Sequence, residues 1–91
     1  MKTFDVTFTK EAWQDYQFFL KTDSRLAERI VRLAEDIANT PKRGIGKPEP
    51  LKNDFTGFWS RRIDKKNRLI YRFIDNDTVE IVRCKGHYGN N

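Results

Sequence analysis

The chain has 91 residues, of which 34% are charged and 37% hydrophobic, and its formal net charge is +5. This length suffices for one hydrophobic core but not for two, so we expect a single domain spanning residues 1–91. The single Cys84 excludes an intrachain disulfide, and the sequence lacks both a secretory signal and the roughly 18 apolar residues of a membrane span, so we expect a cytoplasmic protein.

The positive charge lies in the second half of the chain. Residues 1–40 carry six Lys or Arg against seven Asp or Glu, whereas residues 41–91 carry twelve against six. Such asymmetry is typical of proteins that bind a polyanion, most often a nucleic acid, although abundant cations can also serve only to keep a surface soluble. We favour a nucleic-acid partner.

The first half predicts a strand and two helices. Apolar and polar residues alternate over residues 4–8, which is typical of a strand with one buried face. Thr9 can cap a helix over residues 10–21, and any of residues 22–24 can cap a second helix that ends at residues 39–41. Each helix has an apolar stripe that we expect to face the core: Ala12, Trp13, Tyr16, Phe19 and Leu20 in the first, and Leu26, Ile30, Leu33 and Ile37 in the second.

The second half predicts an ordered loop and three strands. Residues 41–50 contain all three prolines and two of the five glycines, and they follow neither a helix nor a strand period. Two turns, rich in Asp and Asn, separate three runs of strand-forming residues. The runs span residues 58–63, 68–74 and 79–85, and the turns span residues 64–67 and 75–77. Ile81 and Val82 are both apolar and break the alternation of the last strand, where a bulge would explain them.

This order of elements predicts an α+β fold. A strand, two helices and three further strands can form two layers, in which the two N-terminal helices pack on one face of a mostly antiparallel four-stranded sheet. Strand alternation then predicts that two arginines converge on the open face. Trp59 and Ile63 mark the buried face of their strand and leave Arg62 on the other, and the same argument leaves Arg68 on the open face of the next strand. Planar guanidinium groups there can each donate two hydrogen bonds to a phosphate.

Glu49 is the candidate proton acceptor. It lies between Pro48 and Pro50, which restrict the backbone and present the carboxylate on a stiff segment. A carboxylate surrounded by cations is readily ionised, and in a partly dry pocket it can serve as a general base. The cations near it in sequence that we predict to bind RNA are Lys47, Lys52 and Arg61.

Glu49, Arg62, Arg68 and His87 form a set suited to cutting RNA. Glu49 can accept the proton of the ribose 2′-hydroxyl, the two arginines can stabilise the pentacoordinate phosphorus, and His87 can protonate the departing 5′-oxygen. Tyr88 can stack on or support the reacting groups. This chemistry needs no metal or other cofactor, and the His and carboxylates lack the close spacing of zinc ligands.

Each of these assignments has an ordinary alternative. Glu49 can pair with a neighbouring lysine on the surface, the two arginines can be cross-strand surface charges, and His87 can be a solvated residue near the chain end. Two other functions therefore stay open. The chain could be a non-catalytic module that binds the ribosome or RNA, or a structural partner of an acidic regulator such as a repressor.

Two segments of the chain read GKPEPLKNDFTGFWSRRIDKKNRLIYRF and, ending three residues before the last residue, CKGHY. In this order and spacing they closely resemble the YoeB family of bacterial toxins, within the RelE-like superfamily. The similarity spans nearly the whole chain, including the helix with Trp13, Asp15 and Tyr16. It implies a RelE-like fold and a toxin of a type II toxin–antitoxin system, which cleaves messenger RNA in the ribosomal A site without a metal and so inhibits translation.

The resemblance also implies partners and residue roles. The partners would be the ribosome with its messenger RNA, a YefM-type antitoxin whose acidic tail covers the active site, operator DNA through the antitoxin complex, and a second copy of the toxin. The family's general base falls on Glu49, its arginines on Arg62 and Arg68, its general acid on His87, its C-terminal tyrosine on Tyr88, and two basic positions on Lys47 and Lys52. This chain departs from the family pattern at Gly86, where a bulkier residue is common, and in residues 89–91, which follow the usual end.

Overall fold

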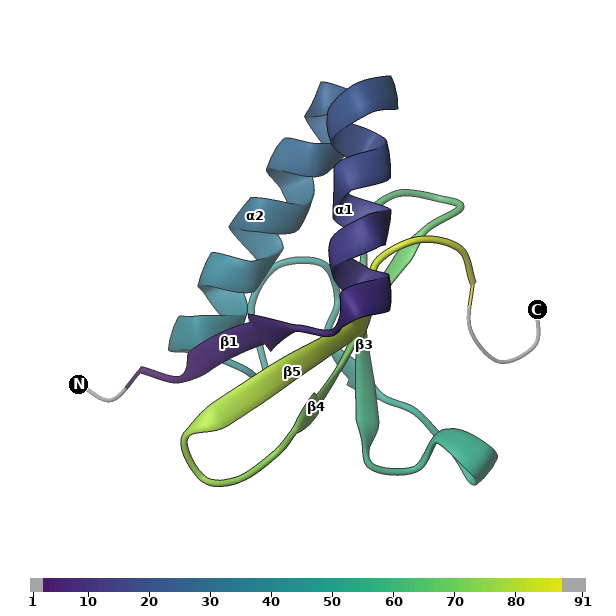
Figure 1. The fold of residues 1–91 in the computed structure, drawn as a ribbon. Coiled ribbons are helices and arrows are strands. Elements are labelled where there is room, and N and C mark those ends of the chain that lie inside the picture. The colour runs from purple at the N-terminus through teal and green to yellow at the C-terminus, as the bar shows by residue number, and fades with distance from the viewer. Residues whose placement is uncertain (1–2, 88–91) are drawn as a thin grey trace.

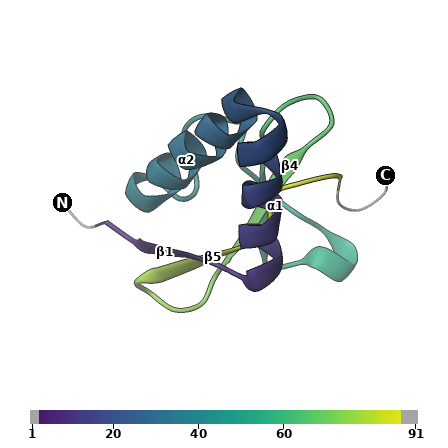
Figure 2. The same cartoon turned by 45° about the horizontal axis from the view of Figure 1, so that its top comes forward.

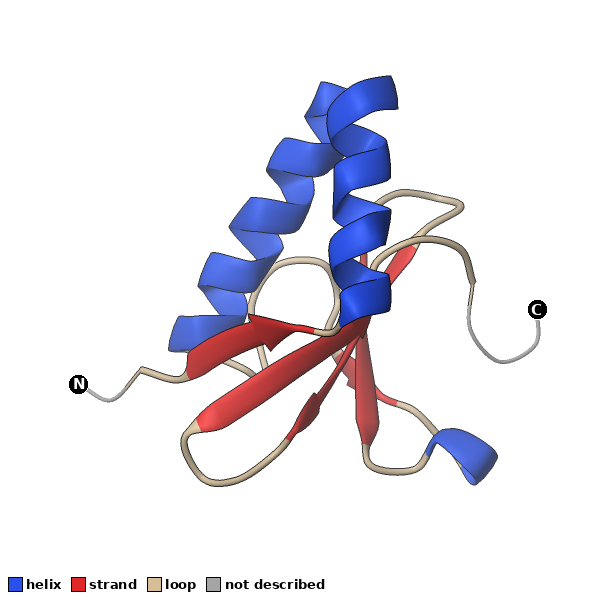
Figure 3. Cartoon of the chain, viewed as in Figure 1, coloured by secondary structure: helices blue, strands red, loops and turns tan. Residues whose placement is uncertain are grey.

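The computed structural model describes residues 3–87, which form two α-helices, a short 3₁₀ helix and a sheet (Figures 1 and 3). The elements are β1 (Asp5–Phe8), α1 (Lys10–Thr22), α2 (Ser24–Asn39), β2 (Glu49–Pro50), a 3₁₀ helix (Asn53–Phe55), β3 (Phe58–Arg62), β4 (Arg68–Phe73) and β5 (Thr78–Arg83). Neither long helix of this described part has the length and apolar character needed to cross a membrane.

The sheet has five strands in the order β1–β5–β4–β3–β2. β1 runs parallel to β5, and all other neighbours are antiparallel. Both helices cover the same side of the sheet (Figure 2), so the predicted α+β layers are confirmed. The predicted count of four strands is wrong, because Glu49 and Pro50 pair with Ser60 and Trp59 as an edge strand instead of continuing the loop.

Pro50 is compatible with this strand because of its place at the edge. The N–H of Leu51 donates to the carbonyl of Phe58 at 2.8 Å. Bonded and non-bonded residues alternate in an antiparallel pair, so the nitrogen of Pro50 points away from β3, where no ladder bond is lost. The proline content of residues 41–50 therefore predicted a loop, although residues 49–50 form a strand by pairing with β3.

Both helices begin at predicted capping positions. The hydroxyl oxygen of Thr9 accepts a hydrogen bond from the N–H of Ala12 at 3.1 Å and donates to the carbonyl of Val82 at 3.0 Å. Asp23 Oδ1 accepts from the N–H of Arg25 at 3.2 Å. Such caps contribute about 1 kcal/mol each. The Thr9 cap also joins the start of α1 to β5.

The core lies between the helices and the sheet, and three of the four residues in the predicted α2 stripe are fully buried. The buried stripe of α1 is narrower than predicted. Ala12 and Phe19 point inward, whereas Trp13 is 47% exposed and Leu20 is 52% exposed. Trp13 lies beside the buried stripe of α1 and packs edge-on against Phe8 of β1, with the ring centroids 5.7 Å apart.

The irregularity predicted in the last strand is confirmed. Ile70 of β4 pairs with Arg83, but the next residue, Tyr71, pairs with Ile81. Val82 is therefore an extra residue on β5, which is the definition of a bulge.

Cys84 follows the bulge as a buried thiol. Its Sγ lies 3.2 Å from the carbonyl oxygen of Ala12, and its backbone N–H donates to Asp15 Oδ2 at 3.0 Å. Burial, and then the nearby Asp15 charge, raise the pKa of the Cys84 thiol to about 12, while Arg83 opposes them. The thiol is therefore neutral and serves packing, as expected of a buried cysteine without an adjacent base.

Candidate active site

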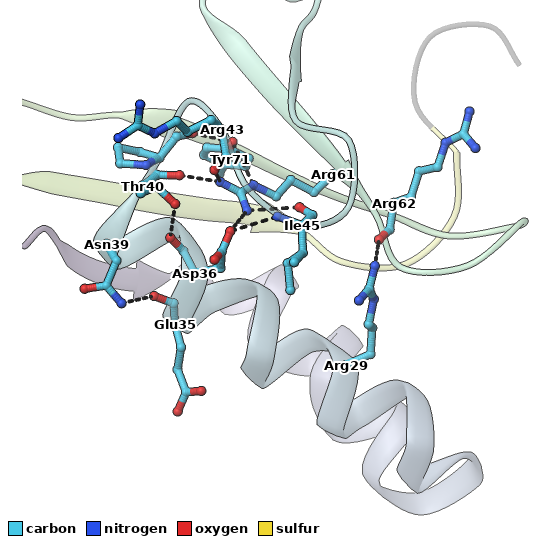
Figure 4. A network of polar contacts seen from close by, with 11 residues as sticks. Arg29, Glu35, Asp36, Asn39, Thr40, Arg43, Ile45, Arg61, Arg62 and Tyr71 are labelled. Carbon is cyan, nitrogen blue, oxygen red and sulfur yellow. Dashed lines mark hydrogen bonds and ion pairs between the residues drawn. The ribbon is translucent and has the colours of Figure 1, made fainter.

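Arg61 is fully buried, which corrects the expectation that it binds RNA. It obeys the alternation of β3, in which Trp59, Arg61 and Ile63 face the helices. A buried guanidinium is tolerated only when its donors are used and its charge is balanced. Figure 4 shows Arg61 turned into a set of polar partners, while the side chain of Arg62 extends away from them.

Five hydrogen bonds occupy the guanidinium of Arg61. Its partners are Asp36 Oδ2 (2.5 Å), the carbonyls of Thr40 (2.7 Å), Arg43 (2.9 Å) and Ile45 (3.0 Å), and the Tyr71 hydroxyl (3.2 Å). The Tyr71 hydroxyl donates in turn to the carbonyl of Pro41 at 2.6 Å, and burial raises its pKa above the ordinary value. We call Arg61, Asp36 and Tyr71 the buried cluster. It fastens residues 40–45 to the sheet and so fixes the loop that leads to β2.

Glu49 is carried by the loop that the buried cluster anchors. The carbonyl of Gly46 accepts a hydrogen bond from the N–H of Arg62 at 2.7 Å. Gly46 has a φ of +80°, and a Cβ there would lie 2.8 Å from Leu33 Cδ2, so the close approach requires glycine. Glu49 then pairs with Ser60, which places its exposed carboxylate on the face of β3 opposite the helices. The carboxylate makes no hydrogen bond or ion pair with any described residue.

Arg62 and Arg68 are direct partners across β3 and β4, and both side chains lie on the face opposite the helices. Arg62 is exposed, and its guanidinium has no partner within residues 3–87, while Arg68 Nη1 donates to the carbonyl of Asp64 at 3.2 Å. Both arginines line a hollow of about 500 Å³, together with Arg29, Ile63, Asp64 and Lys65. Like charges opposite each other are destabilising, and a bound anion such as a phosphate would remove that repulsion.

His87 lies against the turn between β3 and β4. The N–H of Arg68 donates to the carbonyl of Gly86 at 2.9 Å, and the N–H of Gly86 donates to Asn67 Oδ1 at 2.8 Å. His87 follows, with its Nε2 3.2 Å from the carbonyl of Lys65 and its side chain exposed. Tyr88 lies outside the described residues.

The strand register brings three of the predicted site residues to neighbouring positions on one face. Glu49 is opposite Ser60, Arg62 is two residues further along β3, and Arg68 is opposite Arg62. Cross-strand and next-but-one neighbours of this kind lie about 5–8 Å apart. His87 comes to the same end of the sheet through its contact with the turn. Lys47 and Lys52 flank β2 and are both exposed, in contrast to Arg61.

Asp15 and Asn67 are site-supporting residues that the sequence analysis did not identify. Asp15 is 7% exposed and binds Arg83 Nε at 2.8 Å as well as the N–H of Cys84, so it holds the end of β5 against α1. Asn67 was recognised only as a turn residue. An Asp and an Asn three residues apart do predict side-chain bonds within a turn, but the bond to Gly86 joins distant parts of the chain.

The fold is shared with toxins of bacterial toxin–antitoxin systems. A YoeB dimer from Staphylococcus aureus is 38% identical, with a TM-score of 0.84, over 94% of this chain and 99% of that one. The toxin in a heterotetrameric YoeB–YefM toxin–antitoxin complex from Staphylococcus aureus is also 38% identical, with a TM-score of 0.82, over 93% of this chain and 98% of that one.

The chain belongs to the YoeB-like toxins of bacterial type II toxin–antitoxin systems, whose family model matches residues 8–88. Toxin YoeB of Streptomyces coelicolor is 48% identical over 83 residues, which cover 91% of this chain and 98% of that protein. The resemblance carried by the KPEP, GFWSRRI and HY segments is thereby confirmed.

Proposed function

We propose that this toxin is a ribosome-dependent endonuclease that cleaves messenger RNA in the ribosomal A site and so inhibits translation. The observation that supports this best is the placement of Glu49, Arg62 and Arg68 on one exposed face, with His87 held at the same end of the sheet. The four side chains supply a base, two fixed positive charges and an acid. These groups are needed when the 2′-oxygen of a ribose attacks phosphorus and the 5′-oxygen departs.

In the proposed reaction, the Glu49 carboxylate accepts the proton of the ribose 2′-hydroxyl. The 2′-oxygen forms a bond to phosphorus, and Arg62 and Arg68 stabilise the negative charge that develops on the phosphate oxygens. The bond between phosphorus and the 5′-oxygen breaks, and His87 gives that oxygen a proton. The products are a 2′,3′-cyclic phosphate and a free 5′-hydroxyl, and every proton is accounted for by protein side chains without a metal. In this scheme Tyr88 would support or stack on the reacting nucleotide.

Dependence on the ribosome is supported by how open this surface is. Glu49, Arg62 and His87 are all exposed. Such an open surface offers little enclosure to hold a flexible RNA in the geometry of attack. A near-attack arrangement contributes several kcal/mol to catalysis, so an external scaffold that fixes the RNA would make a large difference. We propose that Lys47 and Lys52, on either side of β2, contact the RNA backbone there.

We propose that the chain acts in the cytoplasm together with a YefM-type antitoxin. Support comes from the Staphylococcus aureus YoeB–YefM complex, and from the YoeB dimer for assembly with a second copy. An acidic antitoxin segment would neutralise the exposed arginines, and operator DNA would be bound only through the resulting complex.

Mapping of RNA 5′ ends on translating ribosomes tests the proposed activity. The parent protein should create new 5′ ends within A-site codons, and Glu49→Ala and His87→Gln should abolish or greatly reduce them. Glu28→Ala, which removes an exposed carboxylate from α2, is the matched control and should cleave like the parent. If Glu49→Ala and His87→Gln both cut messages as the parent does, the assigned chemistry is wrong.

Two other outcomes would favour the alternatives. Ribosome binding that weakens with salt, without any cleaved RNA, would indicate a non-catalytic RNA-binding module. Binding to the antitoxin but not to ribosomes would indicate a structural partner of an acidic repressor.

A further inference from the structure

We propose that Asn67 is a positioning residue that holds the general acid His87 at the site. This inference rests on the proposed endonuclease function. It assigns a role to a side chain that contacts neither the arginines' guanidinium groups nor the imidazole among the described contacts, and that acts through the backbone of Gly86.

The orientation of the Asn67 amide is fixed by its neighbours. Its Nδ2 donates to Asp64 Oδ1 at 3.1 Å, and an ionised carboxylate can only accept hydrogen bonds. The Asn67 Oδ1 must therefore be the atom that faces Gly86, whose N–H it accepts at 2.8 Å. Asp64 Oδ1 also accepts from the backbone N–H of Asn67 at 2.7 Å, so the turn itself holds the amide in place.

Asn67 and Arg68 bind the two backbone polar groups of Gly86, its N–H and its carbonyl. While Asn67 accepts from the N–H of Gly86, the N–H of Arg68 donates to the Gly86 carbonyl at 2.9 Å. Gly86 has a φ of +86°, a conformation that few other residues adopt readily, so the chain bends here into His87. We call these two bonds to Gly86 the glycine clasp. The imidazole then reaches the carbonyl of Lys65 in the same turn.

The glycine clasp connects the acid to one of the charge-stabilising arginines. Arg68 begins β4 directly after Asn67, so the turn that carries Arg68 also fixes the path of the segment before His87. Upstream, Asp15 holds the N–H of Cys84, and Nζ of Lys85 lies 4.6 Å from the centroid of the Phe18 ring in α1. Without Asn67, one described bond secures the backbone of Gly86 to the turn, the bond from the N–H of Arg68 to the Gly86 carbonyl. A displacement of about 1 Å at a catalytic group can cost about 100-fold in rate.

Asn67→Ala removes the acceptor for the Gly86 N–H and does not change the identity of any proposed catalytic residue. Single-turnover cleavage on programmed ribosomes should fall by about 10- to 100-fold at saturating protein, while the protein concentration giving half-maximal cleavage stays the same. Asn39→Ala is the matched control, because it removes an asparagine that also binds a backbone group, the Glu35 carbonyl, far from His87. It should cleave like the parent.

A double-mutant cycle separates positioning of His87 from a general effect on the fold. If Asn67 acts through His87, then adding Asn67→Ala to His87→Gln should lower the rate much less than it lowers the rate of the parent. Equal losses in both backgrounds would overturn the proposal.

Hydrogen exchange tests the glycine clasp without reference to activity. The Gly86 amide should exchange faster in Asn67→Ala by about tenfold or more, while the Tyr71 amide, within β4, keeps the parent rate and reports an intact sheet. Unchanged exchange at Gly86 would refute the clasp. If the parent protein cleaves no RNA, the proposed function fails, whereas faster exchange at Gly86 in the variant would still establish that Asn67 holds the segment before His87.

Discussion

The two faces of β3 use adjacent arginines in opposite ways. On the helix side, Arg61 is fully buried and five hydrogen bonds occupy its guanidinium. On the open side, Arg62 is exposed, and its guanidinium makes no hydrogen bond or ion pair with any described residue. The difference of one position in the strand therefore decides whether a guanidinium holds the fold together or is left available to a ligand. Four predictions test how completely the two roles are separated.

The largest expected effect is on stability at the buried cluster. Arg61→Ala would remove the donor to three loop carbonyls and the cationic partner of Asp36, whose carboxylate would keep the N–H of Ile45 as a donor. Removing one partner of a buried ion pair costs about 3–5 kcal/mol. Urea unfolding followed by tryptophan fluorescence would measure the loss. Arg61→Met keeps much of the side-chain volume and should show most of the same loss. A change below about 1 kcal/mol would mean that the buried cluster does not anchor the loop.

The next largest effect is on the proposed cleavage activity, and it should distinguish the two arginines of β4, Arg68 and Arg72. Arg68→Ala should lower the rate by about 10²- to 10³-fold, as expected for the removal of a group that stabilises developing charge. Arg72 lies on the same face of β4 but is already paired with Glu80 at 3.0 Å, so Arg72→Ala should leave the rate unchanged. Primer extension on translating ribosomes measures both. Equal losses of cleavage rate in Arg68→Ala and Arg72→Ala would show that the charge of the whole basic face matters, and that Arg62 and Arg68 have no special role.

A smaller effect is expected on the buried side at alkaline pH. The pKa of Cys84 is raised from 9.0 to about 12, mainly by burial, and burial also raises the pKa of Tyr71. The folded state holds these protons more tightly than the unfolded state, so their contribution to stability is complete below about pH 9 and is lost as the pH rises toward 12. For Cys84 the loss of stability by pH 11 amounts to roughly 3 kcal/mol.

Urea unfolding between pH 8 and pH 11 checks this prediction. Cys84→Ala should show a flatter decline of stability with pH than the parent, because it lacks the titrating thiol. An identical slope in the two proteins would mean that the thiol is accessible to water in the folded state.

The smallest expected effect is on the stability of the open face. Arg62→Ala removes one of two like charges that face each other across β3 and β4, so the free energy of unfolding should stay the same or rise by up to about 0.5 kcal/mol. Salt screens such repulsion, so any gain should be larger in 10 mM than in 500 mM salt, roughly following the Debye length. Arg62→Lys keeps the charge and should match the parent. A large loss of stability in Arg62→Ala would contradict the division between the two faces.

The elements with strong local patterns could be predicted from the sequence. Thr9 as a cap, the two helices, the three long strands and the irregularity at Val82 all follow from periodicity and turn residues. Alternation also assigned the open face to Arg62 and Arg68 correctly. What local patterns lack is pairing between distant segments. The strand at Glu49 depends on β3, so its proline-rich sequence alone indicated a loop.

The misassignment of Arg61 has a related cause. Its place among other cations suggested an RNA contact, although alternation put it on the same side as Trp59. The partners that make its burial favourable come from Asp36 and from carbonyls of residues 40–45, and nothing in the local sequence announces them. The width of the α1 stripe could not be predicted either, because how far Trp13 is covered depends on where β1 ends beside it.

The edge strand that carries Glu49 also affects how copies of this protein can associate. β2 has two residues, and the outward nitrogen of Pro50 has no hydrogen to offer. A strand from another molecule would find almost no ladder to extend along this border, so association through a continuous intermolecular sheet is disfavoured here. Pro50 thus both stiffens the backbone beside the Glu49 carboxylate and disfavours polymerisation through the β2 edge of the sheet.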